Sequence, residues 1–457
     1  YVNVVRVVSL GVSSFTIIPV YLLSRKFFNE KYSVVCASLF AFIPYLNYNA
    51  GQGLSEPLYI LIFVAAVLFI LNKNPNFSFI SFAIAGFALW VRWPGIILVL
   101  ILSIIFFLNY RKNIQNSMKY IGCITIFLII VSPMLIHRYE QYGDPLFFSM
   151  SSQLFSGNYG TFLASNTQNL EYTSQNYIAE FGIGEFIHKY VISGFANVFE
   201  QIIRISFPYL IILLPFGILF SFRAFDQNKN YIRANWIIII IIILSSVLTF
   251  SIIPERRFLY NIFPFLILFA VIPIQRLIEY GLSTFSFSNQ KKNISLFFIV
   301  LIIAILGSLF MRRFDLPDSQ LEMEKKEFAK QLELLDGKFL VNNENLQYYT
   351  LIMLNNNPEL FKEFSGTYEN NRKVFGDKEI PTVTIYAKSL SELLRLGEEY
   401  DLEYIVIHKD ESTPWYSYLD DVYYNEHMYP QLSKVIDTQN AGYEKLSTKV
   451  FKINYDA

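Results

Sequence analysis

Cysteine and charge are both scarce in this sequence. Its 457 residues include only two cysteines, Cys36 and Cys123, and both lie in apolar stretches, so a disulfide framework and a cysteine zinc site are excluded. Only 16% of the residues are charged, whereas 53% are hydrophobic and 17% aromatic, and the mean hydropathy is +0.37. This composition is too apolar for an ordinary soluble protein and indicates a helical, polytopic membrane protein.

The net charge of zero hides an uneven distribution. Residues 1–311 contain 20 Lys and Arg against 11 Asp and Glu, whereas residues 312–457 contain 17 against 26. We therefore expect a membrane domain over residues 1–311, followed by a polar, acidic domain over residues 312–457. In this tail a charged helical pattern precedes short apolar runs that alternate with helical patterns, as in "KFLVNN", "VTIYA", "SLSELLRLGEEY", "YIVIHK" and "VFKINY". Such alternation predicts a small α/β domain.

The tail shows no strong motif for chemistry. It has no glycine-rich phosphate loop and no cluster of histidine and cysteine. Asp420 and Asp421 are adjacent carboxylates that could bind a cation, but a solvated loop is the better interpretation. His408 and His427 have no partners at the spacing of metal ligands.

Ten apolar segments are candidates to cross a bilayer, which takes about 20 helical residues. Several are shorter, and we expect those to be broken or sheltered by neighbouring helices. Two of them are separated only by "RWP", which is either a tight turn or a kink at Pro94. The predicted spans are residues 2–23, 32–47, 55–71, 77–91, 94–109, 120–136, 206–222, 234–252, 257–275 and 294–311.

Basic residues in the short connections predict the orientation of these spans, because cytoplasmic loops carry an excess of Lys and Arg. With residue 1 outside, thirteen basic residues fall in cytoplasmic connections and three in short external turns. We therefore expect the connection 137–205 and the tail 312–457 on the extracytoplasmic side of the cell membrane. The external three are Arg92, Arg256 and Arg257, and the thirteen are Arg25, Lys26, Lys31, Lys73, Arg111, Lys112, Lys119, Arg223, Lys229, Arg233, Arg276, Lys291 and Lys292.

The connection 137–205 ends in a helical pattern, "EFIHKYVISGFANVFEQIIR". Its apolar residues Phe186, Tyr190, Val198 and Ile202 recur at helical spacing. This stripe predicts a helix that lies in the outer membrane interface, and packing against the tail domain is the alternative.

Polar residues within the membrane domain gather at the predicted outer ends of the spans. Glu56, in "NAGQGLSEPLYIL", begins a span, and Pro57 after it suits a first helical turn. Its carboxylate either complements the helix dipole or belongs to a site that faces the bundle. Arg92, in "WVRWPG", is either an interface anchor with a cation–π contact or an inward-pointing ligand for an anion. His137 and Arg138 follow another span, where a local turn explains them, and they are weaker candidates for substrate binding.

The stretch "IIPERRFLYNIFPFL" gives the strongest signal for an anion site. Pro254 suits the first turn of a helix whose N-terminus faces outward, and the free N–H groups of such a terminus attract anions. Arg256 and Arg257 add two charges of the kind that recognises phosphate with two hydrogen bonds. The stretch therefore predicts a phosphate site at membrane level, unless Glu255 neutralises one arginine. Arg92 is expected to contribute to the same site.

Several stretches together resemble the GT-C membrane glycosyltransferases, specifically the family of protein O-mannosyltransferases and aminoarabinose transferases. Each stretch is degenerate alone, but their order and spacing over about the first 310 residues are more specific. The tail is similar to external α/β domains of some prokaryotic members. The stretches are "RVVSLGVSSFTIIPVYLLSRKFF", "GLSEPLYILIF", "ALWVRWPGIILVL", "YEQYGDPLFF" and "ERRFLYNIFPFL".

The resemblance implies that a sugar moves, with inversion, from a polyprenyl- or dolichyl-phosphate donor to a lipid, glycan or protein acceptor at the extracytoplasmic face. In the family, an acidic residue on the first external loop deprotonates the acceptor. This chain opens with what resembles the family's second span. We therefore expect the first span and the catalytic aspartate to precede Tyr1, and no residue of the chain matches that base.

The resemblance also implies roles for residues that are present. Arg257 matches an Arg-Tyr pair before a proline-containing helix, with Phe258 in place of the tyrosine. It is implied to hold the donor phosphate with Arg256 and Arg92, although the Arg-Pro element around Arg92 is interrupted here. Glu56 matches an acidic position near the acceptor or sugar and is implied to assist proton transfer, without being the base.

Other functions are alternatives. A transporter or flippase of lipid-linked sugars would favour internal repeats and polar sites near mid-membrane, but there is no repeat and the polar residues lie at one face. An oligosaccharyltransferase would carry a Trp-Trp-Asp signature, which is absent, and a non-catalytic scaffold is the last alternative. We expect membrane lipids but no nucleic acid as further partners. The residues indicate no metal site, and a divalent cation is kept as a candidate cofactor.

Overall fold

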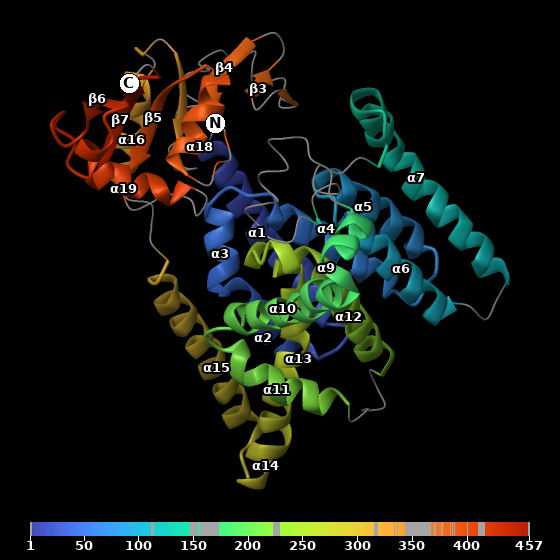
Figure 1. Ribbon diagram of the computed structural model, residues 1–457. Coiled ribbons are helices and arrows are strands. Elements are labelled where there is room, and N and C mark those ends of the chain that lie inside the picture. The colour runs from blue at the N-terminus through green and yellow to red at the C-terminus, as the bar shows by residue number, and fades with distance from the viewer. Residues whose placement is uncertain are drawn as a thin grey trace. The chain divides into compact units, whose positions relative to one another are not determined.

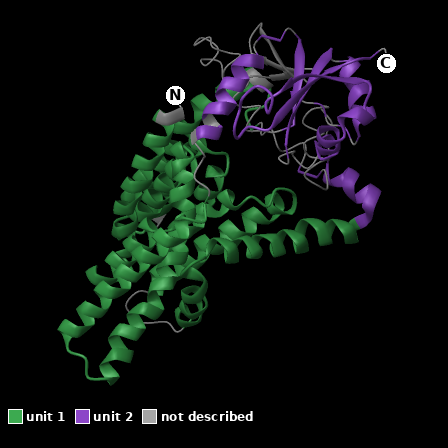
Figure 2. Ribbon diagram, turned by 90° about the vertical axis from the view of Figure 1, so that its left-hand side faces the viewer, with its two compact units in different colours: residues 1–151, 183–314 green, residues 152–182, 315–457 purple. Residues whose placement is uncertain are grey.

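The computed structural model separates into two compact units, coloured separately in Figure 2. Unit 1 comprises residues 1–151 and 183–314, and unit 2 comprises residues 152–182 and 315–457. The structure describes residues 2–110, 114–146, 154–155, 173–222, 229–314, 319–332, 334–335, 337–342, 367–369, 372–375, 378–383, 385, 387, 389–399, 401–409 and 416–455.

Unit 1 is helical, with α7 and α15 at its opposite edges in Figure 1. The sequence of helix α9 crosses the boundary between the two units and has a break at Gly182, where φ is 83°. The helices are α1 (Val2–Ser24), α2 (Glu30–Ala41), α3 (Pro44–Gly51), α4 (Glu56–Ile70), α5 (Phe77–Val91), α6 (Gly95–Tyr110), α7 (Ile114–Tyr142), α9 (Ser174–Ile187), η2 (His188–Ser193), α10 (Gly194–Ile205), α11 (Leu210–Ser221), α12 (Lys229–Ile252), η3 (Arg256–Ile262), α13 (Phe263–Arg276), η4 (Leu277–Gly281), α14 (Leu282–Thr284) and α15 (Asn289–Met311).

The predicted apolar segments all fall on helices, but the count of ten spans is not confirmed. Among the described residues, five helices are long and apolar enough to cross a membrane: Val4–Ser24, Gln115–Glu140, Lys229–Ile252, Arg256–Thr284 and Asn289–Met311. Two further candidates are bent pairs, α2 with α3 at 49° and Ser174–Ile205 with α11 at 116°. Helices α4, α5 and α6 are apolar but shorter. The chain is thus a helical membrane protein in which several predicted spans are short or broken.

The break between α2 and α3 replaces the single predicted span 32–47. Pro44 begins α3, and the residue before it is extended, as expected before proline. Two side chains donate hydrogen bonds to backbone carbonyl groups at the break. Asn47 Nδ2 donates to Ala41 O at 3.0 Å, and the Tyr209 hydroxyl donates to Phe42 O. A helix break at membrane depth is tolerated where side chains supply such hydrogen bonds.

Helices of unit 1 approach closely at glycines, as is common in membrane proteins. A Cβ atom at Gly217 of α11 would clash with the carbonyl oxygen of Phe269 on α13, and one at Gly194 of α10 would clash with Val247 O on α12. Pro273 follows Phe269 by four residues and has no N–H to donate to that carbonyl. The backbone of α11 therefore lies directly against this carbonyl.

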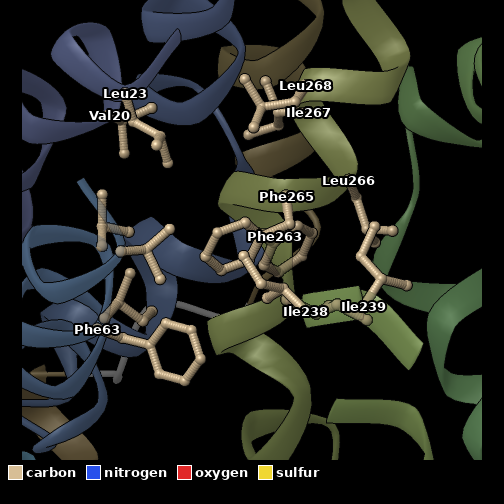
Figure 3. Packing of buried hydrophobic residues seen from close by; sticks show 14 of the residues in the cluster. Val20, Leu23, Phe63, Ile238, Ile239, Phe263, Phe265, Leu266, Ile267 and Leu268 are labelled. Carbon is tan, nitrogen blue, oxygen red and sulfur yellow. The ribbon is translucent and has the colours of Figure 1, made fainter. Parts of the chain in front are cut away.

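Helix α13 forms the centre of the core of unit 1. Figure 3 shows Phe263 and Phe265 of α13 among buried side chains from α4 and α12, including Phe63 and Ile238. The rings of Phe63 and Phe265 meet edge to face, with centroids 5.6 Å apart. Such pairs add about 1 kcal/mol to the burial of the rings. Since η3 continues directly into α13, this packing also fixes the arginines at the start of η3.

The "RWP" segment is a tight turn between two antiparallel helices. Helix α5 ends at Val91, α6 begins at Gly95, and the Gly95 N–H donates to Arg92 O at 2.9 Å. A Cβ atom at Gly95 would meet the backbone of Ala88 at 2.5 Å, so only glycine lets α6 fold back this closely.

Unit 2 contains a mixed seven-stranded sheet in the order β2-β3-β4-β1-β5-β7-β6, which confirms the α/β class of the tail. Strand β1 is parallel to β4 and β5, and the other pairs are antiparallel. The sequence patterns predicted β1, β5, β7, α16 and α18, but not β2, β3 and β6. The run "VTIYA" (383–387) overlaps β4 only at Val383, and its positions 384 and 386 lie outside the described residues. The elements are α16 (Ser319–Leu332), β1 (Lys338–Val341), β2 (Thr367–Glu369), β3 (Arg372–Phe375), β4 (Lys378–Val383), α18 (Leu390–Glu399), β5 (Leu402–His408), α19 (Tyr418–Tyr424), η6 (Glu426–Met428), β6 (Leu432–Asp437) and β7 (Thr448–Ile453).

A buried carboxylate joins α16 to the β6–β7 connection. Glu324 Oε2 accepts the backbone N–H groups of Lys445 at 2.9 Å and Leu446 at 2.7 Å, and Gln320 Nε2 donates to its other oxygen at 3.3 Å. Burial raises the pKa of Glu324, but the backbone and Gln320 hydrogen bonds outweigh it and hold the pKa below its ordinary value.

Candidate functional site

The predicted site residues of unit 1 converge at one end of its helices. The start of α4, the turn after α5 and the start of η3 lie together, because an ion pair joins the first two and the ring of Phe258 on η3 contacts arginines of the second and third. These three places carry Glu56, Arg92 and the pair Arg256–Arg257. We refer to these four residues as the polar cluster.

The segment before α4 fixes the position of Glu56. Gly53 has a φ of 77°, and a Cβ atom there would lie 3.1 Å from the backbone nitrogen of Arg6 on α1. Both the left-handed conformation and the close approach favour glycine. The Ser9 hydroxyl of α1 also donates to Leu54 O at 3.2 Å. The backbone therefore enters α4 against α1, with Glu56 as the first helical residue, as predicted.

Glu56 and Arg92 form a buried ion pair. Arg92 Nη1 contacts Glu56 Oε1, and the two side chains are 18% and 5% exposed. Arg92 therefore points inward rather than into the membrane interface. The second carboxylate oxygen, Oε2, is buried and has no hydrogen-bond partner among the described residues. It is thus an acceptor that an incoming hydroxyl group could satisfy.

The ring of Phe258 lies beside two guanidinium groups. The Arg92 and Arg257 Cζ atoms are each 5.5 Å from its centroid. An aromatic face attracts cations and holds these two like charges close to one position. The Arg257 guanidinium also pairs with the carboxylate of Glu255, but these two side chains are 41% and 38% exposed. Solvent therefore reaches this second pair far more than the pair made by Arg92.

Arg256 is held by two other helices. Its Nε donates to Gln201 Oε1 of α10 at 3.2 Å, and its Cζ lies 5.8 Å from the ring of Tyr45 on α3. The sequence does not indicate either partner: the helical pattern around Gln201 is visible only in its apolar residues, and Tyr45 lies in a predicted span. The contact ties the start of η3 to the helix 194–205.

The predicted helix start at Pro254 is wrong. Residues 253–255 are not helical, η3 begins at Arg256 as a 3-10 helix, and the α-helix α13 begins only at Phe263. Pro264, rather than Pro254, occupies the first turn of α13. The anion-attracting character of this stretch therefore rests mainly on the two arginine side chains and less on the dipole of a long helix.

His137 and Arg138 lie on a helix and not in a turn after a span. Helix α7 continues to Tyr142 and stops before Gly143, whose φ is 70°. The Arg138 guanidinium lies 4.9 Å from the ring of Trp93, which brings it beside the turn that carries Arg92. The side chain of His137 is exposed, and none of the contacts found among the described residues joins it to the polar cluster.

Three buried polar side chains on α3, α4 and η3 were not predicted. Tyr59 follows Glu56 by one helical turn and its hydroxyl is buried, and Asn49 of α3 and Asn261 of η3 each bury a side-chain oxygen. The Asn49 and Asn261 oxygens have no hydrogen-bond partner in the described part of the chain, and the Tyr59 hydroxyl lies beside the Asn261 side chain. Tyr59 and Asn261 are polar residues within apolar runs, which is too common a signal to single them out, and Asn49 lies among other polar residues.

Neither unit shows a metal site in its described residues, which contain no group of three or more His, Cys, Asp or Glu side chains able to share a metal ion. In unit 2, Asp421 is part of a helix and accepts hydrogen bonds from Asn425 Nδ2 at 2.6 Å and from the Tyr429 hydroxyl. These bonds lower the pKa of Asp421. His408 is buried, with Nδ1 2.9 Å from Thr448 Oγ1. Both residues therefore have structural partners.

Part of the sequence of unit 1 matches a known protein family. Residues 2–137 match the pattern of the dolichyl-phosphate-mannose-protein mannosyltransferases. The matched stretch includes Glu56 and Arg92 and ends before Arg256 and Arg257. No curated protein sequence matches the chain.

Solved structures show the fold of the chain. It is similar to the oligosaccharyltransferase of Archaeoglobus fulgidus in its complex with Zn and sulfate, with a TM-score of 0.53 and 14% identity over 89% of this chain and 56% of that chain. It is also similar to ArnT of Cupriavidus metallidurans bound to undecaprenyl phosphate, with a TM-score of 0.50 and 13% identity over 99% of this chain and 84% of that chain. The chain thus spans little more than half of the archaeal enzyme. These likenesses confirm the GT-C membrane fold that the sequence resemblance implied.

Proposed function

We propose that this chain is a membrane glycosyltransferase that transfers a sugar from a polyprenyl-phosphate donor to an acceptor hydroxyl. The observation that carries the proposal is the polar cluster, in which Arg92 and Arg257 share the ring of Phe258 beside the buried Glu56. The family match and the GT-C fold support the same reaction class. The proposal includes a membrane domain over residues 1–311 and an α/β domain over residues 312–457 on the extracytoplasmic side of the cell membrane.

The cluster suits the charge change of this reaction. The acceptor oxygen, after losing its proton to a base, attacks the anomeric carbon with inversion, and the bond from that carbon to the phosphate oxygen breaks. The donor phosphodiester carries one negative charge, whereas the leaving polyprenyl phosphate carries up to two. Guanidinium groups that contact this phosphate therefore stabilise the transition state more than the donor. This argument requires a cation whose hydrogen bonds can be transferred to a phosphate.

Arg257 meets this requirement best. Its pair with Glu255, two residues before it, is half-exposed, and pairs of this kind are worth only about 0–1 kcal/mol. Arg92 instead holds a buried carboxylate, so moving it to a phosphate would leave Glu56 uncompensated. We therefore assign Arg257 as the main phosphate ligand, Arg256 as a supporting one and Arg92 as the residue that positions Glu56.

Glu56 is proposed to bind the acceptor or sugar. Arg92 holds its Oε1, so Oε2 is the atom left to accept a hydrogen bond from a substrate hydroxyl. The exposed His137 and the half-buried Arg138 are proposed to contact substrate farther from the reacting atoms, with Arg138 acting beside Trp93.

The test is transfer of labelled sugar from defined polyprenyl-phosphate donors by the full-length protein in detergent or nanodiscs. We expect Arg257→Ala to lower kcat/KM by about 10²–10³-fold, the usual effect of losing one group that stabilises transition-state charge. Arg204→Ala is the matched control, because Arg204 forms an exposed pair with Glu200 and lies outside the polar cluster. Equal activity of the Arg257 variant and the wild type would remove its phosphate role.

The oligosaccharyltransferase class is the second candidate, favoured by the structural likeness to the archaeal enzyme. The same assay with a polyprenyl-diphosphate oligosaccharide and an asparagine-containing peptide would separate the two. Glycopeptide formation without transfer from the monophosphate donor would establish the second candidate and overturn the first.

A further inference from the structure

The connection from α13 to α15 is an ordered turn. Helices η4 and α14 extend α13, and the chain reverses at Ser286, whose φ is 57°. The Phe287 N–H donates to Leu282 O at 3.2 Å and the Ser286 N–H donates to Ser283 O at 3.0 Å, which together form a Schellman cap. Ser288 then caps the start of α15. We refer to residues 276–292 as the interfacial turn.

The interfacial turn exposes large apolar side chains. Ile278 is buried and Leu282 packs against the core, which holds the turn to unit 1. On the other side the ring of Phe285 is 74% exposed. The exposed apolar residues of the turn are Leu277, Tyr280, Phe285 and Phe287. Exposing four such side chains to water in one short segment is unfavourable, so we expect an apolar environment to cover them.

Cations accompany these rings. The Arg276 guanidinium lies 4.9 Å from the ring of Tyr280, and Lys291 Nζ lies 5.7 Å from that of Phe287. Aromatic rings beside Lys and Arg are typical of the membrane–water interface, where the ring is partly apolar and the cation meets phosphate.

The surrounding charge is strongly positive. Lys292 Nζ donates to Ser283 Oγ at 2.6 Å. Lys31 Nζ, at the start of α2, donates to Asn293 Oδ1 of α15 at 2.8 Å, so the connection between α1 and α2 lies beside the interfacial turn. Residues 24–31 and 275–293 contain six basic side chains against two acidic ones, Glu30 and Glu279. Glu279 Oε1 is already hydrogen-bonded by Gln275 Nε2 at 3.1 Å.

Helix α15 places the interfacial turn at headgroup depth. Its 23 residues are largely exposed and apolar, which marks a lipid-facing helix. Lys292 lies in its first turn and Arg312 just after its end, and the rise between them is about 30 Å, the thickness of the hydrocarbon core. The turn also lies at the opposite end of η3 and α13 from Arg257, and Figure 1 shows α14 at that end of unit 1.

We propose that the interfacial turn binds anionic phospholipids of the leaflet opposite the polar cluster. Lys291, Lys292 and Lys31 contact the headgroup phosphates, while Phe285 and Phe287 insert among the headgroups. Charge complementarity selects an anionic rather than a zwitterionic lipid. The excess of basic residues at this end makes it the cytoplasmic leaflet. This binding is independent of the proposed sugar transfer.

The test uses the full-length protein in nanodiscs of phosphatidylcholine with phosphatidylglycerol, followed by detergent extraction and native mass spectrometry of retained lipids. The double variant Lys291→Gln/Lys292→Gln is expected to lower the affinity for phosphatidylglycerol by about fivefold for each lysine, with phosphatidylcholine unchanged. Phe285→Ser/Phe287→Ser is expected to reduce the retention of both lipids.

Lys119→Gln is the matched control, because Lys119 is also predicted to be cytoplasmic and also contacts an asparagine, Asn76 Oδ1, at 2.9 Å. Its phosphatidylglycerol retention should equal that of the wild type. An unchanged ratio of the two lipids in the double lysine variant would overturn the proposal. Displacement of the lipid by inorganic phosphate would also overturn it, because the site would then bind the free anion.

Discussion

The Tyr209 hydroxyl donates a hydrogen bond to the carbonyl of Phe42, although 167 positions separate the two residues. Phe42 lies where α2 bends into α3, and Tyr209 lies where the helix 174–205 bends into α11. One side chain thus joins two broken helices of unit 1. Since Tyr45 and Gln201, which hold Arg256, lie on these same two broken segments, the bond also stabilises the surroundings of the polar cluster.

We predict that Tyr209→Phe lowers the stability of unit 1 by about 1 kcal/mol, since it removes one hydrogen bond and leaves a carbonyl unpaired within the membrane. The free energy of unfolding in mixed micelles, measured against denaturant, checks this. Tyr139→Phe on the exposed face of α7 is the control and should leave stability unchanged. Equal stability of both variants would mean that another donor forms a hydrogen bond with the carbonyl of Phe42.

Loss of Arg92 should affect folding as well as function. Arg92→Ala leaves the carboxylate of Glu56 buried without its cation, which costs about 3–5 kcal/mol. The double variant Glu56→Gln/Arg92→Gln should recover most of this loss, because no buried charge is left. The free energy of unfolding of both variants, measured in mixed micelles, checks this loss and its recovery. A stable Arg92→Ala protein with weaker donor binding would instead identify Arg92 as a phosphate ligand.

For the exposed pair of Arg257 and Glu255, we predict that removing the carboxylate strengthens the binding of polyprenyl phosphate. A donor phosphate has to displace the Glu255 carboxylate, so Glu255→Gln should tighten the binding of polyprenyl phosphate by about two- to fivefold. Titration of the lipid phosphate into protein in nanodiscs measures this. Glu200→Gln, which removes the partner of Arg204, serves as the control. Weaker binding after Glu255→Gln would show that the carboxylate positions the arginine for the phosphate.

In unit 2 the lowered pKa of Glu324 predicts how stability changes with pH. The carboxylate binds fewer protons in the folded state, so its contribution is complete above its ordinary pKa of 4.5 and is lost as pH falls through the lower folded value. Glu324→Gln should cost about 2 kcal/mol at neutral pH, since two backbone N–H groups lose a charged acceptor. Hydrogen exchange of the Leu446 amide in the full chain, at pH 7 and below pH 4, measures both effects. Equal protection in the variant and the wild type at pH 7 would contradict the assignment.

The helical membrane architecture was predictable from the sequence because long apolar runs are a strong signal. Breaks within such runs were less predictable. Pro44 was visible, but its effect depends on the side chains of Asn47 and Tyr209, and nothing local in the sequence indicates that Tyr209 reaches it. The count of ten spans is not confirmed for the same reason, since tertiary partners decide whether a short apolar helix crosses or bends.

The composition of the polar cluster was largely predictable, but its pairing was not. Glu56 and Arg92 were separate candidates, each with a local explanation, and only the structure shows that they neutralise one another. Pro254 was assigned to a helix start because proline is favoured there, yet the 3-10 segment begins after it. His137 and Arg138 directly follow a predicted span, which favours a turn, whereas α7 continues until Gly143 stops it.

The crossing of α11 and α13 limits how this gene can vary. A side chain at position 217 would collide with the backbone of Phe269, and backbone cannot rotate away as a side chain can. At positions 11 and 51 the same added carbon meets nothing within 4 Å. Sequences that keep this fold should therefore retain glycine at position 217 while they change freely at the other two. A codon change that adds a side chain at position 217 would push α11 and α13 apart.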